Sequence, residues 1–199
     1  MDAHRLAYRQ KKASRLNAWL VFLDESGFLM APLVRRSWAP RGQTPVLLQR
    51  GVHHQKVSVI AALCLDSHAH SVRFYFRLYP NRNIQACQVI PFLRHLDREL
   101  DRPWLLLWDR LNAHRARRAT AFLSARPYPQ AYFLPAYAPD LNPVEYAWSY
   151  LKMNPLANSP HFDLPRLALT TRRHARALQH RPGLLSSFLS HSPLFSRPI

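Results

Sequence analysis

Two of the eleven acidic residues directly follow continuous apolar runs, a context in which a carboxylate can do chemistry. Asp24 follows Trp19–Leu23, and Asp109 follows Trp104–Trp108. Runs of this kind are typical of strands buried on both faces, and ligands in open α/β sheets bind beyond the carboxyl ends of such strands. Two neighbouring carboxylates repel each other unless a cation lies between them, and an all-oxygen site suits Mg²⁺ or Mn²⁺. A helix or turn cap is the alternative interpretation of each.

A third carboxylate, Glu145, belongs to the run Asn142-Pro143-Val144-Glu145. This run also fits a capping box, with Asn142 as N-cap, Pro143 as the first helical residue and Glu145 as the third. A capping box does not prevent metal binding, because one helix start can serve both purposes. Three carboxylates around divalent ions are the minimum for two-metal phosphoryl transfer.

The charge balance predicts an anionic partner. The 199 residues include 28 Lys+Arg against 11 Asp+Glu, a formal net charge of +17. Nucleic acid is the first candidate and an anionic membrane surface the second, although a GC-rich genome also produces arginine-rich proteins. Four arginines follow Asp109 and could contact DNA phosphates, namely Arg110, Arg115, Arg117 and Arg118.

Several classes of protein are excluded by composition. Two cysteines cannot form a disulfide scaffold, and four glycines in other spacings leave out a dinucleotide fingerprint or a Walker loop. The longest apolar run, Val57–Leu65, is far shorter than the roughly 20 residues that span a bilayer. With no signal-peptide pattern at the N-terminus, we expect a cytoplasmic protein without a membrane partner.

The elements that must position the carboxylates follow from hydrophobic periodicity. We expect a basic lead-in over 1–18, as a short helix or a flexible segment, and loops over 28–52 with a short strand near Trp38. A turn is expected at 67–70, a helix with a kink or restart at Pro91, and a loose Ser- and Pro-rich end. The expected strands are Trp19–Leu23, Lys56–Leu65, Ser71–Leu78, Trp104–Trp108 and Ala131–Leu134, and the expected helices Asn83–Leu100, Arg115–Leu123, Val144–Lys152 and Leu164–Gln179.

This order predicts an α/β fold with a mixed five-stranded sheet. Three strands joined by short connections form an antiparallel meander, and two strands separated by helices add in parallel. Helices are expected on both faces of the sheet.

Four segments resemble the catalytic domain of bacterial insertion-sequence transposases of the mariner superfamily. They are FLDESGF at 22–28, WAPRG at 38–42, WDRLNAH at 108–114 and LPAYAPDLNPVE at 134–145, followed by Trp148, Leu151 and Lys152. These relatives are DDE-type DNA endonucleases and strand transferases with a ribonuclease-H-like fold. The similarity spans about residues 19–155, which implies a catalytic domain over 19–155 and a basic helical tail over 156–199.

The resemblance implies a role for particular residues. Asp24, Asp109 and Glu145 would form the metal-binding triad for two Mg²⁺ or Mn²⁺ ions, with Asp24 bridging both. His114 and Asn142 match family positions and would orient ligands or DNA, with a local hydrogen bond as the alternative. Arg41 matches the family's loop and would contact DNA, with a solvated loop position as the alternative.

The resemblance also implies partners. The DNA would be the terminal inverted repeats of an element and the target DNA, handled by a homodimer in the bacterial nucleoid. Family members carry an N-terminal helix-turn-helix domain, whereas about 18 residues precede the first expected strand here. We therefore expect the catalytic part of a transposase, acting with a separate helix-turn-helix chain. The alternatives are a non-catalytic DNA-binding remnant and a ribonuclease-H-like nuclease.

Overall fold

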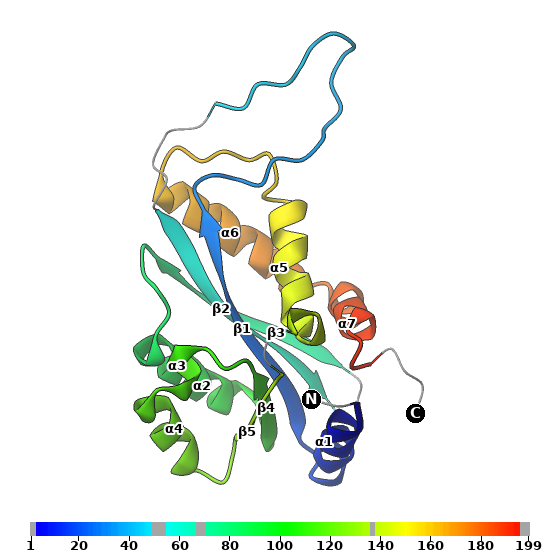
Figure 1. Ribbon diagram of the computed structural model, residues 1–199, viewed down its shortest axis with the longest axis vertical. Coiled ribbons are helices and arrows are strands. Elements are labelled where there is room, and N and C mark those ends of the chain that lie inside the picture. Colours follow the sequence, from blue (N-terminus) through cyan, green and yellow to red (C-terminus); the bar gives the residue numbers. More distant parts are fainter. Residues whose placement is uncertain (1–2, 49–54, 67–70, 136–137, 196–199) are drawn as a thin grey trace.

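A computed structural model of the chain describes residues 3–48, 55–66, 71–135 and 138–195 (Figure 1). The sheet strands are β1 (Trp19–Leu29), β2 (Lys56–Asp66), β3 (Val72–Pro80), β4 (Trp104–Trp108) and β5 (Gln130–Phe133). The helices are α1 (Ala3–Arg15), α2 (Ala86–Glu99), α3 (Asn112–Arg115), α4 (Arg117–Ser124), α5 (Pro143–Met153), α6 (Leu164–Gln179) and α7 (Pro182–His191), with a 3₁₀ turn, η1, at Pro139–Leu141. Among these described residues, no helix is both long and apolar enough to cross a membrane.

The five strands form one sheet in the order β3-β2-β1-β4-β5. The pairs β1–β2 and β2–β3 are antiparallel, and β1–β4 and β4–β5 are parallel. Helices α5, α6 and α7 cover one face, and α2 and α4 cover the other. The predicted mixed sheet with helices on both faces is therefore confirmed.

The central strand β1 has an apolar first half because both of its faces are covered. Leu20 and Phe22 belong to the core beneath α5–α7, whereas Trp19, Val21 and Leu23 belong to the core beneath α2 and α4. Side chains of a strand alternate between faces, so an unbroken apolar run is what this position requires.

The predicted end of β1 at Asp24 is wrong. The strand continues to Leu29 because β2 pairs with all eleven of its residues, from Trp19 opposite Asp66 to Leu29 opposite Lys56. Only Trp19–Phe22 pair with β4 on the other side. Asp24 therefore lies inside a strand, at the point where β1 loses its parallel neighbour.

Other local expectations also changed. Helix α2 continues through Pro91 instead of restarting there; the proline withholds only one hydrogen bond, from the carbonyl of the exposed Cys87. No strand forms near Trp38, whose side chain is 100% exposed and has no sheet edge beside it. The turn predicted at 67–70 lies outside the described residues.

The tail predicted to be loose carries α7, which packs on the sheet through Leu185, Phe188 and Leu189, alongside Leu167 and Leu178 of α6. These side chains belong to the same core as α5. The described tail helices thus complete the cover of one sheet face, and the division predicted at residue 155 does not fall at a break in the core.

Candidate active site

The register of β1 and β4 brings the two aspartates together. Phe22 lies opposite Leu107 in this parallel pair, so continuing the register by two residues sets Asp24 level with Asp109. Asp24 is buried at 5% exposure, whereas the Asp109 side chain, beyond the last residue of β4, is 38% exposed. The two carboxylates thus mark the point where the sheet opens between β1 and β4.

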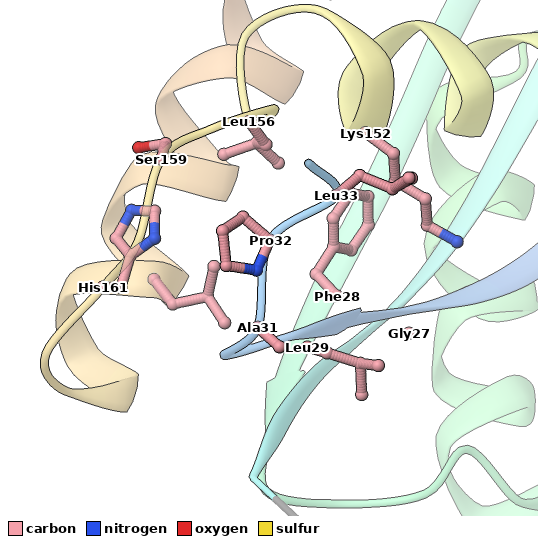
Figure 2. A pocket seen from close by; sticks show the side chains of 11 residues that line it. Gly27, Phe28, Leu29, Ala31, Pro32, Leu33, Lys152, Leu156, Ser159 and His161 are labelled. Atoms are coloured by element: carbon pink, nitrogen blue, oxygen red, sulfur yellow. The ribbon is translucent and has the colours of Figure 1, made fainter. Parts of the chain in front are cut away.

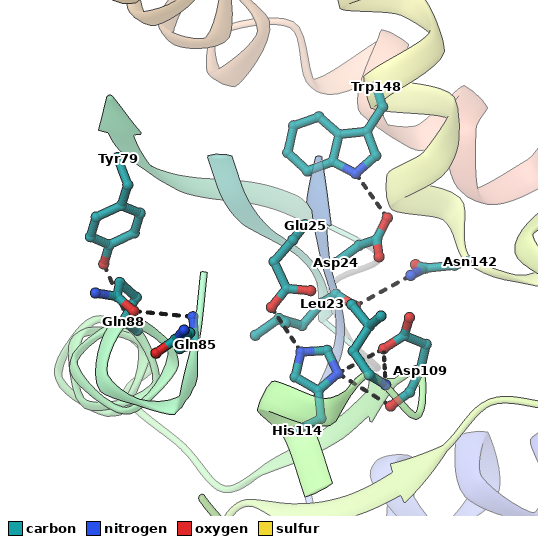
Figure 3. A network of polar contacts seen from close by, with 11 residues as sticks. Leu23, Asp24, Glu25, Tyr79, Gln85, Gln88, Asp109, His114, Asn142 and Trp148 are labelled. Atoms are coloured by element: carbon teal, nitrogen blue, oxygen red, sulfur yellow. Dashed lines mark hydrogen bonds and ion pairs between the residues drawn. The ribbon is translucent and has the colours of Figure 1, made fainter. Parts of the chain in front are cut away.

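Helix α5 brings Glu145 to the same place. Hydrogen bonds tie the start and the middle of this helix to β1: the Trp148 indole Nε1 donates to Asp24 Oδ2 at 2.8 Å, and Asn142 Nδ2 donates to the Leu23 carbonyl at 3.3 Å (Figure 3). Glu145, in the first turn of α5, is close enough to raise the pKa of Asp24. The structure therefore brings all three predicted carboxylates together.

The capping box predicted as an alternative for Glu145 is only half formed. The Asn142 side chain does cap α5 by accepting from the Val144 backbone N–H at 3.3 Å. Its own backbone N–H, however, donates to the Pro139 carbonyl at 2.8 Å and does not need the Glu145 carboxylate. The cap interpretation is correct for Asp109, whose Oδ1 accepts from the Leu111 N–H at 3.0 Å, and wrong for Asp24, which lies within β1.

The carboxylates repel one another in this setting. Burial raises the pKa of Asp24 well above its ordinary value, and the charges of Glu145, Glu25 and Asp109 raise it further, against the hydrogen bond from Trp148. Burial also raises the pKa of Glu145, with a further contribution from Asp109 and opposition from Lys152. A hard divalent cation would relieve this repulsion, and an all-oxygen donor set fits such an ion.

His114 is enclosed between two carboxylates (Figure 3). Its Nδ1 lies 2.7 Å from Asp109 Oδ1, its Nε2 lies 2.8 Å from Glu25 Oε1, and its ring stacks on Trp108 at 4.2 Å. Burial opposes the charged ring, but the bonds to Asp109 and Glu25 prevail and raise the pKa of His114 to about 9. Ligand atoms of Glu25, Asp109 and His114 all lie within 4.8 Å of one another. A charged imidazole has no lone pair for a metal, so at neutral pH this trio is an ion-pair network.

Lys152 was not predicted as a site residue. Its Nζ donates to Ser26 Oγ at 2.7 Å, and burial lowers its pKa, against the opposing effect of the Glu145 and Asp24 charges. Lys152 follows Glu145 by seven residues, two turns along one helix face, and this spacing was an available signal. Figure 2 shows its ammonium directed away from His161, which lines the same apolar cavity of about 180 Å³.

The predicted DNA-contacting arginines are exposed. Arg115, Arg117 and Arg118, the α3–α4 arginines, lie on the short helices after Asp109, and Arg110 stands 5.6 Å over the Phe133 ring. Arg41 belongs to segment 31–48, which extends away from the sheet in Figure 1. The α3–α4 arginines and Arg110 therefore belong to the segment that directly follows Asp109. Within the described residues, Arg41 makes no contact with the carboxylates.

A sequence model described as DDE superfamily endonuclease matches residues 19–168. The chain belongs to this family. The match includes all three clustered carboxylates and ends within α6. No curated protein matches the chain.

Solved structures of Mos1 mariner transposase share the fold. The paired-end complex with Mg is 20% identical at a TM-score of 0.63 and covers 98% of this chain and 58% of that one. The catalytic domain with Raltegravir and Mg is 17% identical at a TM-score of 0.56, covering 96% of this chain and 91% of that one. The paired-end complex with Mn is 19% identical at a TM-score of 0.58. The ribonuclease-H-like fold is thus confirmed, and this chain spans about three fifths of the length of the paired-end proteins.

Proposed function

We propose that this chain is the catalytic domain of a transposase, which cleaves DNA phosphodiesters at element ends and transfers the freed strands into target DNA. The proposal rests on one observation. Asp24, Asp109 and Glu145 lie together at the place where the pairing of β1 with β4 ends and α5 begins. Membership of the DDE endonuclease family supports the same conclusion. Residues from three elements converge there, on a rigid sheet and a helix capped by Asn142.

We propose that the site holds two divalent ions, Mg²⁺ or Mn²⁺. Asp24 would contact both, and Asp109 and Glu145 would each hold one. Such ions would activate the attacking oxygen and stabilise the leaving oxygen. The protein's own contribution is orientation: Trp148 holds one oxygen of Asp24, and Asn142 ties the start of α5 to β1. Paired-end complexes of Mos1 have been solved with Mg and with Mn, which supports this choice of metal.

DNA would be bound mainly through its backbone. The α3–α4 arginines, Arg110 and Arg41 are exposed and would pair with phosphates, which positions the duplex without reading its sequence. Mos1 structures hold a paired-end complex with a transposon end and a strand transfer complex. We also propose a homodimer, as the family resemblance implies, with recognition of the element ends by a helix-turn-helix chain. The expected cytoplasmic location stays a prediction.

A cleavage assay tests the proposal. Purified protein is incubated with DNA carrying the element's ends and Mg²⁺ or Mn²⁺, and wild type is compared with Asp109→Ala. We expect metal-dependent nicking that the substitution abolishes; nicking that survives it would refute the triad. Cleavage by wild type only after a helix-turn-helix chain is added would identify a divided enzyme. Failure even then would favour the non-catalytic remnant, and cleavage confined to the RNA strand of a hybrid would favour the nuclease.

A further inference from the structure

The Asp109 carboxylate has two oxygens in different surroundings. Its Oδ1 forms an ion pair with His114 Nδ1 at 2.7 Å and accepts a hydrogen bond from the Leu111 N–H at 3.0 Å, while the same Nδ1 also lies 3.2 Å from the Asp109 backbone carbonyl. Within the described residues, its Oδ2 has no hydrogen-bond partner. A carboxylate held by two donors on one oxygen has its rotation fixed, so the other oxygen is presented in one direction.

His114, which contacts this carboxylate, is itself held on three sides. His114 is buried, its ring stacks on Trp108 with the planes 15° apart, and its Nε2 is 2.8 Å from Glu25 Oε1. Glu25 projects from β1 to the face opposite Asp24, because neighbouring strand residues alternate. The bridge Glu25–His114–Asp109 therefore connects the far face of β1 to the end of β4.

Glu25 is only partly satisfied in this bridge. Its side chain is 9% exposed, and its Oε2 is buried without a hydrogen-bond partner in the part of the chain that the structure describes. A partly satisfied buried carboxylate is less favourable than an apolar residue in the same place. Its contact with His114 fixes the orientation of that ring.

We infer that Glu25 and His114 are positioning residues that hold Asp109 Oδ1, so that Oδ2 is the oxygen offered to the metal. This inference rests on the proposed function. In this role neither residue would need to touch the ion or the DNA. Groups that orient ligands in this way commonly change metal affinity by about 10–100-fold when they are removed.

Two substitutions of one residue separate positioning from packing. In His114→Asn the amide nitrogen takes roughly the place of Nδ1 and can still donate to Asp109, but the contact with Glu25 is lost. In His114→Gln the amide nitrogen takes roughly the place of Nε2 and keeps Glu25, but the donor to Asp109 is lost. Mn²⁺ affinity is measured calorimetrically on DNA-free protein, and melting temperature is measured in EDTA.

We expect both variants to melt at similar temperatures, with Mn²⁺ affinity falling about tenfold or more in His114→Gln and only a fewfold in His114→Asn. Glu25→Ala, which frees the ring, should also weaken Mn²⁺ binding. Glu99→Ala is its control, because it removes an exposed acid from the His95–Glu99 surface pair. Equal affinity losses in the two His114 variants, or none, would overturn the inference alone. A wild type that binds no Mn²⁺ would overturn the proposed function and this inference with it.

A second inference concerns the outer face of α6. Arg166, Arg172, Arg173 and Arg176, here called the α6 arginine stripe, are all exposed. They lie on the helix side opposite the buried Leu167, Thr171, Ala175 and Leu178. Residues 164–199 contain six arginines and no acidic residue.

The stripe is poorly compensated within the protein. Among the described residues, only Arg166 forms an ion pair, with Asp163 at 3.4 Å. A groove of about 410 Å³ runs beside the other three arginines, lined also by Leu169, Thr170 and His174. Burial and the charge of Arg173 lower the pKa of His174, which is consistent with a positive local potential.

The structure assigns the α6 arginine stripe to the phosphate backbone of duplex DNA. Ten residues separate its ends, about 15 Å along the helix. The same length of B-DNA carries about nine phosphate charges. Arginine pairs well with phosphate oxygens, so the match is one of charge and of length.

Anisotropy titrations with a random-sequence duplex in EDTA test this assignment independently of catalysis. The triple variant Arg172→Ala, Arg173→Ala, Arg176→Ala is compared with a control of equal charge loss, Lys11→Ala, Arg15→Ala, Arg98→Ala, all at exposed positions. Each phosphate contact contributes about 0.9 to the slope of log K against log salt. We therefore expect this slope to become shallower by about 2–3 in the stripe variant and by much less in the control. Equal changes of slope in the two triple variants, or no change in the stripe variant, would overturn the assignment of the stripe to DNA.

Discussion

Asp24→Asn should make the metal-free protein more stable while removing its response to metal. Asp24 is 5% exposed, and the neighbouring Glu145, Glu25 and Asp109 carboxylates disfavour its ionised form. Its pKa is therefore higher in the folded protein than in the unfolded chain. A group raised in this way stabilises the fold below its unfolded pKa, and that contribution is lost as pH rises through the folded value. At neutral pH, which lies above the unfolded pKa, the aspartate is therefore a net cost to stability that asparagine removes.

The size of the stability change depends on the hydrogen bond that asparagine retains. Its side-chain oxygen can still accept from Trp148 Nε1, the bond that Asp24 Oδ2 makes at 2.8 Å. Only the charge is lost, so we expect a gain of about 1–2 kcal/mol in the free energy of unfolding. For a chain of this length, that corresponds to a rise of about 2–8 °C in melting temperature.

Calorimetry in EDTA and in excess Mn²⁺ provides the assay. When the Mn²⁺ concentration is a hundred times the dissociation constant, the free energy of unfolding of the wild type should rise by about 2.7 kcal/mol. That of Asp24→Asn should rise much less, so the order of the two melting temperatures reverses. In EDTA, the difference in stability between wild type and Asp24→Asn should vanish below about pH 4. Glu99→Gln, an exposed acid paired with His95, is the control. A destabilised Asp24→Asn in EDTA, or equal stabilisation of both proteins by Mn²⁺, would refute the reasoning.

Three further predictions concern the surroundings of the site. Trp148→Phe removes the donor to Asp24 and should lower the cleavage rate about 10–100-fold, with kinetics at saturating metal as the measurement; an unchanged rate would contradict it. His114 has a raised pKa of about 9, so its stabilising contribution, roughly 3 kcal/mol at most, is full below about pH 6.5 and lost as pH rises through about 9. Urea unfolding of the metal-free protein should show this fall, and His114→Gln should lack it. Replacing the three α3–α4 arginines by alanine should make the salt slope of DNA binding shallower by about 2–3, and an unaltered slope would exclude them from the interface.

Much of the fold could be predicted from the sequence because its signals are local. Continuous apolar runs such as Trp104–Trp108 are long enough to indicate buried strands, and α/β order restricts their arrangement. The end of β1 could not be predicted, because Asp24–Gly27 are polar or small and resemble a turn. They remain in a strand since β2, thirty or more residues later, supplies a partner for each of them.

The sequence by itself determined which carboxylates to examine, because Asp24, Asp109 and Glu145 stand in distinctive contexts among few acids. Only the tertiary structure decided how they are held. Glu25 meets His114 across 89 positions, and Trp148 meets Asp24 across 124. Such contacts depend on strand register and on where α5 packs, neither of which is encoded in local spacing. For that reason the carboxylates proposed as metal ligands were visible in the chain, whereas the residues proposed to orient them became visible only in the fold.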